Sequence, residues 1–117
     1  MKILAFDTSC LDIELALLDD GKLLGARIQK AAESGRQEAA SFLIPAIDQL
    51  LKELLISKNE IDLIVVGSGP GSFTGARVAV STARSIAQAL DLPLIPISRL
   101  ESLAYLSRQP VFVLLDA

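Results

Sequence analysis

The stretch VVGSGPGSFTGAR, from Val65 to Arg77, connects a short apolar run to a long alanine-rich segment. It contains four glycines and one proline: Gly67, Gly69, Gly71, Gly75 and Pro70. This density of glycine and proline predicts a sharp turn between a buried strand and a helix. The unpaired N–H groups and positive dipole end of that helix could bind an anion. The alternative is a structural turn in which Ser72 or Thr74 caps the helix.

The turn matches neither of two common phosphate-binding motifs. A Walker A loop requires Gly-x-x-x-x-Gly-Lys-Ser/Thr, but no glycine pair here has that spacing and no lysine follows Lys58. A dinucleotide fingerprint requires Gly-x-Gly-x-x-Gly. Counted from Gly67 or Gly69, the third glycine is replaced by Ser72 or Thr74. Anion binding therefore stays open without a named motif to support it.

Before this stretch, the pattern predicts three short strands in succession. Apolar runs at 2–6, 11–18 and 22–29 have the length of strands. The sequence Asp19-Asp20-Gly21 is a hairpin turn signal, because Asp and Gly tolerate positive φ. An antiparallel meander is expected.

After the meander, strands and helices alternate, which predicts parallel strands. Residues 31–37 are polar and loop-like, and from Glu38 the apolar period becomes helical. Pro45 lies inside this pattern, so the helix either begins near Ser41 or bends at the proline. The following elements are expected to be a strand at 63–66, a helix at 72–90, a strand at 92–97 and a helix at 98–106. The fold class is α/β with a mixed sheet.

The two long helices carry more apolar and small surface than one sheet needs. The helix at 72–90 contains no carboxylate, and its only charges are Arg77 and Arg84. It is rich in Gly, Ala, Ser and Thr, which would let another helix approach closely. Either this helix packs only on its own sheet, or a second face receives a partner helix.

Asp7-Thr8-Ser9 follows the first strand and is a second candidate site. A carboxylate and two hydroxyls at a strand end could hold a magnesium-bound water and a phosphate. A solvated turn explains the same residues equally well.

The composition narrows the function further. The 117 residues suit one small domain, and the net charge of −3 without a basic stripe does not favour nucleic-acid binding. There is no histidine, so the usual zinc sites and the commonest general base are missing. Cys10 is the only cysteine, which fits a reducing compartment and an inert packed thiol. Without a signal-peptide or membrane-span pattern, a soluble cytoplasmic protein is expected.

Four stretches together resemble the N-terminal lobe of the TsaB (YeaZ-like) family, over nearly the whole chain. They are ILAFDTS, FLIPAIDQLL, IDLIVVGSGPGSFTGARVAVSTARSIA and PLIPISRLESLA. The block from Gly69 to Arg77 is the most specific of them, whereas the Asp-Thr-Ser start is shared with actin-like ATPases. The resemblance implies a ribonuclease-H-like, actin-like ATPase lobe.

The resemblance also implies a role. TsaB is the non-catalytic dimerization subunit that supports TsaD, the subunit that transfers threonylcarbamoyl to adenosine 37 of tRNA. The implied partners are TsaD as a heterodimer, the ATPase TsaE, and a second copy when the chain is alone, with tRNA contacted only indirectly. No cofactor is required, although ATP or ADP could bind at a subunit junction. The implied interface residues are Phe42, Ile47, Leu50, Leu54, Phe73, Arg77, Val80, Ala83 and Arg84.

Two other functions stay open. One is an actin-like ATPase or kinase lobe that binds ATP and magnesium through Asp7 and the Gly67–Gly75 loop. Its candidate nucleotide or anion-binding residues are Asp7, Thr8, Ser9, Gly69, Gly71 and Ser72. The other is a metal-dependent glycoprotease-like peptidase, which the absence of histidine disfavours.

The C-terminal run VFVLLD repeats the form of KILAFD at the start, an apolar strand that ends in Asp. We therefore expect residues 1–109 to form the actin-like lobe. Residues 110–117 are expected to be the first strand of a second lobe, which is either truncated or naturally missing.

Overall fold

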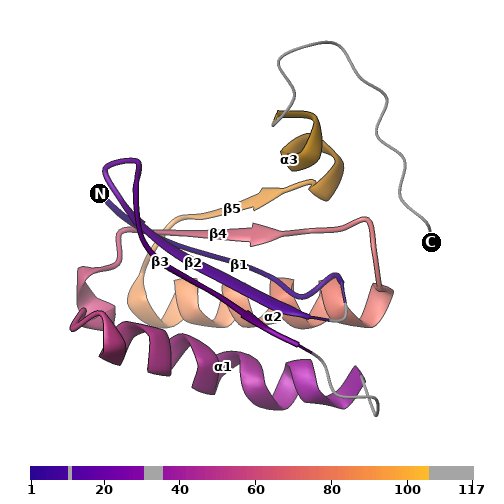
Figure 1. Cartoon of the computed structure of the whole chain (residues 1–117), viewed down its shortest axis with the longest axis horizontal. Helices are drawn as coiled ribbons and strands as arrows, with labels where there is room; N and C mark the ends of the chain where they lie inside the picture. Colours follow the sequence, from indigo (N-terminus) through magenta and orange to yellow (C-terminus); the bar gives the residue numbers. More distant parts are fainter. Residues whose placement is uncertain (11, 31–35, 106–117) are drawn as a thin grey trace.

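The computed structural model describes residues 1–10, 12–30 and 36–105, and describes side chains in the first helix from Ser41 onward. Within this part, an open sheet is covered by two long helices on one face (Figure 1). The predicted strand at 111–116, and with it the predicted division at residue 110, lies outside the described residues.

The sheet has five strands in the order β3-β2-β1-β4-β5. Its strands are β1 (Lys2–Asp7), β2 (Ile13–Asp19), β3 (Lys22–Gln29), β4 (Leu63–Gly67) and β5 (Leu94–Ile97). The first three pair antiparallel, whereas β4 pairs parallel with β1, and β5 pairs parallel with β4. The predicted mixed sheet is confirmed, with β2 and β5 each beginning two residues later than expected.

The hairpin between β2 and β3 turns where the sequence predicted. Asp20 has φ 49° and Gly21 has φ 80°. Two consecutive residues with positive φ give the tight turn whose twist matches antiparallel strands.

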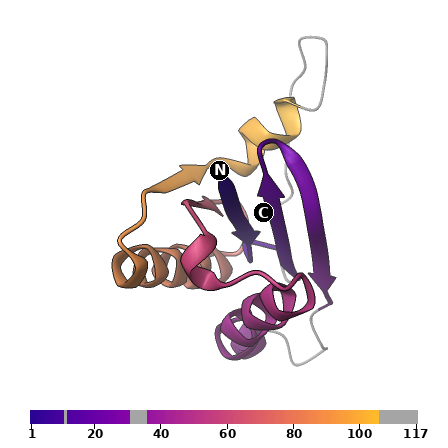
Figure 2. The ribbon, with the colours of Figure 1, turned by 90° about the vertical axis from the view of Figure 1, so that its left-hand side faces the viewer.

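The helices are α1 (Arg36–Glu53), α2 (Phe73–Leu90) and the short α3 (Arg99–Tyr105), with a 3-10 turn η1 (Lys58–Glu60) before β4. Figures 1 and 2 show α1 and α2 side by side on one face of the sheet. Of the two alternatives at Pro45, a helix start near Ser41 is wrong, as is the predicted loop at residues 36 and 37, because α1 begins at Arg36 and continues through Pro45. An internal proline costs roughly 3 kcal/mol, and burial of the apolar face of α1 on the sheet outweighs it.

The core lies between the sheet and these two helices. Alternate residues of β1 and β2 point toward the helices and are buried, among them Leu4, Phe6, Leu15 and Leu17. The helices contribute the other half of the core: Leu43, Ala46, Ile47, Leu50 and Leu51 from α1, and Ala79, Ala83 and Ala87 from α2. The period of two in the strands and of about four in the helices sets which residues are buried.

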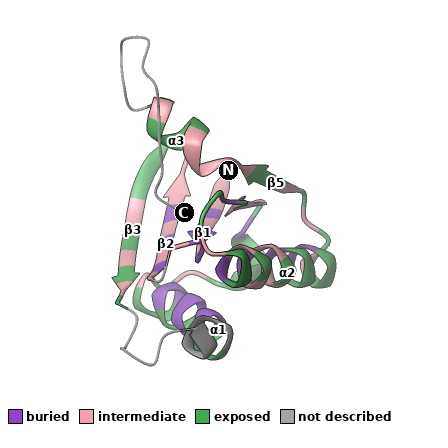
Figure 3. Cartoon of the chain, turned by 90° about the vertical axis from the view of Figure 1, so that its right-hand side faces the viewer, coloured by how far each residue is buried: buried purple, intermediate pink, exposed green. Residues whose placement is uncertain are grey.

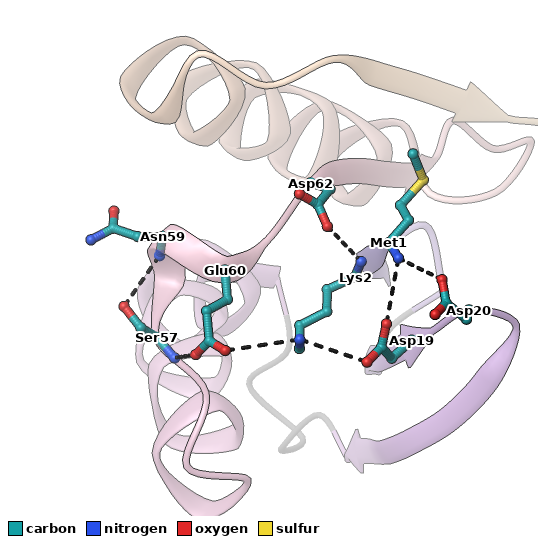
Figure 4. A network of polar contacts seen from close by, with 8 residues as sticks. All are labelled: Met1, Lys2, Asp19, Asp20, Ser57, Asn59, Glu60 and Asp62. Atoms are coloured by element: carbon teal, nitrogen blue, oxygen red, sulfur yellow. Dashed lines mark hydrogen bonds and ion pairs between the residues drawn. The ribbon is translucent and has the colours of Figure 1, made fainter.

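A polar network joins the amino-terminal end of β1 to the β2–β3 hairpin and to η1 (Figure 4). The Met1 ammonium contacts Asp20 Oδ1 at 2.6 Å and Asp19 Oδ1 at 3.5 Å. The Lys2 side chain bridges Asp19 at 3.6 Å and Glu60 at 3.8 Å. These contacts hold three segments that are distant in sequence.

The network predicts how stability depends on pH. The hydrogen bond to the Met1 ammonium holds the Asp20 pKa below its ordinary value, and the same bond raises the pKa of the ammonium. A carboxylate with a lowered pKa stabilises the fold above its ordinary pKa, and this contribution is lost as pH falls through the folded-state pKa. An amine with a raised pKa stabilises the fold below its ordinary pKa of 8.0, and this contribution is lost as pH rises through the folded-state pKa.

We therefore expect a residual N-terminal tag, which removes the Met1 ammonium, to lower the urea midpoint slightly at pH 7. The tag should also flatten the fall in stability as pH rises above 8. Asp20→Asn should reproduce both effects without a tag. Identical pH profiles for the tagged and untagged chains would show that the ammonium contributes nothing.

Candidate functional site

The two candidate sites of the sequence, Asp7-Thr8-Ser9 and the glycine loop, meet in the structure. Both follow the carboxyl ends of parallel strands, β1 and β4, and the junction between β5 and α3 lies at the same edge of the sheet. In α/β sheets this edge is the usual place for a ligand. Here the three loops contact one another.

Hydrogen bonds close the junction between the first two loops. The Thr8 hydroxyl donates to the carbonyl of Gly75 at 2.5 Å, and the N–H of Ser72 donates to the carbonyl of Ser9 at 2.6 Å. Thr8 and Ser9 are each only 1% exposed. Their hydroxyls therefore lie inside the protein, and the turn is not the solvated one that the sequence left open.

The glycines permit this close approach. A Cβ on Gly71 would lie 2.5 Å from the carbonyl oxygen of Ser9, and one on Gly75 would overlap the carbonyl oxygen of Thr8. Only a residue without a side chain fits at either position. Ser72 is the N-cap of α2, where its hydroxyl accepts from the N–H of Gly75 at 3.1 Å. The helix is thus capped by Ser72 rather than Thr74.

The carboxylate of Asp7 already has partners on both oxygens. Its Oδ1 accepts from the N–H of Ser9 at 2.7 Å, and its Oδ2 pairs with the Arg99 guanidinium at 3.5 Å. The exposed fractions of the two side chains are 17% and 21%. The N–H of Arg99 also donates to the carbonyl of Gly69 at 2.8 Å, which ties the β5–α3 junction to the glycine loop.

Arg99 was not singled out from the sequence. The signal that could have found it is its position directly after a predicted parallel strand, at the same edge as Asp7 and the glycine loop. A cation at that edge is the natural counter-charge for the Asp7 carboxylate.

The six predicted nucleotide-binding residues fall in one region. Nucleotide binding by them stays a prediction. The geometry limits its form, because the Thr8 hydroxyl and the N–H of Ser72 are already used within the protein. Among residues 1–10, 12–30 and 36–105, no group of three or more Cys, Asp or Glu side chains is placed to hold a metal ion.

A second feature is an apolar groove of about 540 Å³ between α1 and the end of α2. Ile44 and Pro45 of α1 are exposed on one side, and Ala89 of α2 is exposed on the other. Figure 3 shows buried residues on the inner side of α1 and exposed residues along its outer side. The full lining is Leu4, Ile44, Pro45, Ile47, Asp48, Leu51, Lys58, Ile61, Ile86, Ala89 and Leu90.

The nine predicted interface residues separate into three groups. Phe42, Phe73, Arg77 and Arg84 are exposed, and the Arg77 guanidinium lies 5.4 Å from the centre of the Phe73 ring. Leu54 and Val80 are partly buried against the core.

The third group is buried. Ile47, Leu50 and Ala83 lie in the chain's own core, with exposed fractions of 6%, 2% and 0%. In this conformation Leu50 and Ala83 are covered by the chain itself, whereas Ile47 also lines the groove.

The proposed partner face of small residues on α2 also needs correction. Gly75, Ala79, Ala83 and Ala87 recur every four residues and are the buried face of the helix. Small side chains on this face let the backbone of α2 approach its own sheet closely. The outer face of α2 is polar, with Ser81, Arg84, Ser85 and Gln88 exposed.

Comparisons with known proteins agree on one family. A family model described as "TsaD: tRNA N6-adenosine threonylcarbamoyltransferase" matches residues 32–117. The tRNA threonylcarbamoyladenosine biosynthesis protein TsaB of Bacillus subtilis is 36% identical over 104 residues, which are 89% of this chain and 44% of the relative. A tRNA N6-adenosine threonylcarbamoyltransferase of Chlorobium phaeovibrioides is 29% identical over 87% of this chain and 32% of its own.

A solved structure agrees as well. YeaZ from Pseudomonas aeruginosa superimposes with a TM-score of 0.77 at 31% identity, over 92% of this chain and 51% of that one. The chain thus spans about half the length of these relatives or less.

The sheet order, the helices and this structural likeness define an actin-like, ribonuclease-H-like α/β lobe. None of the helices between residues 36 and 105 is long and apolar enough to cross a membrane. Within the class of actin-like lobes, the chain belongs to the family that the TsaD model describes and is a TsaB/YeaZ-type member of it.

Proposed function

We propose that the chain is a non-catalytic scaffold subunit that supports a TsaD-type transferase in the N6-threonylcarbamoyladenosine modification of tRNA position 37. The apolar groove between α1 and α2 carries the proposal. Ile44, which lines it, is 50% exposed, although residues of this size are usually buried. An exposed apolar groove of this kind is typical of a protein–protein interface.

The second support is that two of the candidate catalytic groups, the Asp7 carboxylate and the Thr8 hydroxyl, already have partners within the protein. Asp7 pairs with Arg99, and the Thr8 hydroxyl bonds to Gly75. No histidine occurs anywhere in the sequence, so no imidazole can act as a base or a metal ligand. A positioning role for these residues explains their contacts better than a chemical one.

The proposed partners follow from the same surface. A TsaD-type subunit is proposed to occupy the groove in a heterodimer, and a second copy is proposed to occupy it when the chain is alone. TsaE is the further protein partner, and tRNA is reached only through the complex. No cofactor is required, and any ATP or ADP would bind at a subunit junction near Asp7 and the Gly67–Gly75 loop. A cytoplasmic location fits this role.

The proposal is tested by reconstituting threonylcarbamoyl transfer to tRNA with a TsaD-type transferase and its accessory enzymes. We expect the product to form only when this chain is added, and Asp7→Asn to support transfer within about two-fold of the unchanged chain, since the carboxylate takes no part in chemistry. Circular dichroism checks that the variant is folded. A folded Asp7→Asn chain that abolishes transfer, or transfer that does not need the chain, would contradict a scaffold role.

A further inference from the structure

The helix α1 ends in a cap that normally contains a glycine. The last helical residue is Glu53, and two hydrogen bonds close the final turn. The N–H of Leu55 donates to the carbonyl of Lys52 at 3.1 Å, and the N–H of Ile56 donates to the carbonyl of Leu51 at 2.9 Å. These two bonds define a Schellman cap, in which one residue after the helix has a left-handed backbone and is usually glycine. Leu55 occupies that position, with φ 57°.

Leucine is an unfavourable residue for this backbone conformation. At positive φ the Cβ of an L-residue lies too close to the following carbonyl oxygen, and a bulky residue there is an outlier. The other two non-glycine residues with positive φ in the described part of the chain are Asp20 and Asp91, and aspartate visits this region more readily. The cap uses only the backbone of residue 55, and glycine would adopt it without strain. The cap therefore does not explain why this residue is a leucine.

The side chain of Leu55 does not serve the packing of the chain either. It is 91% exposed, which it shares with Tyr105 as the largest exposed fraction among the large apolar side chains that the structure describes. The residues on either side, Leu54 and Ile56, are partly buried and pack against the core. Residues held in a strained backbone conformation cluster at sites where another molecule binds. Leu55 combines such a backbone with an apolar side chain that the chain itself leaves in water.

The surroundings of Leu55 are those of an interface residue. Lys52 and Lys58, three residues before and after it, are both exposed, and an apolar contact within a polar rim is the usual anatomy of a protein–protein interface. The segment also borders the α1–α2 groove, because Leu51, Lys58 and Ile61 all line that groove. A partner that fills the groove would therefore reach the loop after α1.

We infer that Leu55 is an apolar anchor for the TsaD-type transferase that is proposed to occupy the groove. This role rests on the proposed function and extends its interface from the groove to the loop after α1. Burial of the leucine side chain by the partner would offset the unfavourable backbone conformation. In the free chain that conformation has no such compensation.

The test is isothermal titration of Leu55→Gly with a TsaD-type transferase. We expect the affinity to fall by about 10-fold to 100-fold, because the partner no longer buries a leucine side chain. The thermal midpoint of the same variant alone should hold or rise by up to about 4 °C, because glycine accepts the positive φ. Leu55→Met is the matched control, since it keeps an apolar side chain of similar volume on the same backbone. It should bind nearly as the unchanged chain does.

A second measurement reports on contact with the partner directly. Leu55→Cys in a Cys10→Ser background leaves a single thiol, which should react readily with a thiol reagent in the chain alone. When the transferase is present at about 100 times the Kd of this variant, the reaction should slow by up to about 100-fold. A thiol that the transferase does not protect would overturn the inference.

The other outcomes separate this role from the proposed function. If the unchanged chain and Leu55→Gly bind the transferase equally well, the proposed function stands and the anchor role fails. If the unchanged chain does not bind, the proposed function fails and the anchor role fails with it. A lower thermal midpoint for Leu55→Gly would show that the side chain stabilises its own chain, which also overturns the anchor role. If light scattering shows that Leu55→Gly loses only a homodimer while the titration is unchanged, Leu55 contacts a second copy and the choice of partner is wrong.

Discussion

Replacement of Gly75 by alanine is expected to lower the free energy of unfolding by about 2–3 kcal/mol. The added methyl group would overlap the backbone carbonyl of Thr8, which cannot move aside as a flexible side chain can. Overpacking of this kind costs about 1–3 kcal/mol. Loss of the hydrogen bond from the Thr8 hydroxyl to Gly75 adds about 1 kcal/mol, and the better helix propensity of alanine returns at most about 1 kcal/mol.

The control is the same substitution at Gly25 in β3. A Cβ there would lie 2.9 Å from a terminal methyl of Leu54, which is the far end of a flexible side chain and can shift. Urea unfolding followed by circular dichroism should show a clearly lower midpoint for Gly75→Ala and a nearly unchanged one for Gly25→Ala. If both variants unfold at the wild-type midpoint, the junction between the Thr8 loop and the glycine loop is not as close as described.

The sequence was sufficient for the order and type of the elements. Strand and helix periods differ, and the turn residues at Asp20-Gly21 and Gly69-Pro70-Gly71 separate them clearly. The position of the glycine loop next to Asp7 could also be predicted from the sequence, because both follow parallel strands of one sheet. The first residue of α1 could not be predicted. The low helix propensity of Pro45 favours a helix that begins near it, whereas burial of the apolar face of α1 on the sheet decides where the helix begins.

The faces of α2 show a second limit. Helical periodicity states which residues share a face, but it does not state which face meets the sheet. The ridge of Gly75, Ala79, Ala83 and Ala87 fitted a partner helix as well as it fitted a sheet. This face meets the sheet because the loop at Thr8 and Ser9 approaches the backbone of α2, and the Thr8–Gly75 contact joins residues 67 positions apart in sequence. The role of Arg99 could not be predicted for a related reason, because its partner Asp7 is 92 residues away in the sequence.

The second large effect concerns the α1–α2 groove, and the variant is Ile44→Glu. Ile44 is half exposed and lines the groove, so the change removes an apolar anchor and introduces a carboxylate where a partner is proposed to exclude water. Asp48, four residues later on the same helix face and paired with Lys52, repels the new charge. A buried unpaired charge at an interface costs about 2–5 kcal/mol, so association with a TsaD-type partner should weaken by about 30-fold or more.

Gln88→Glu is the matched control, because it adds the same charge on an exposed position of α2 that does not line the groove. Isothermal titration of each variant with a TsaD-type transferase gives the two affinities, and light scattering gives the mass of the chain alone. We expect Gln88→Glu to bind as the unchanged chain does and Ile44→Glu to lose both the heterodimer and the homodimer. If Gln88→Glu is the variant that fails, the partner contacts the polar outer face of α2. In that case Phe73 and Arg77, rather than the groove, would be the centre of the interface.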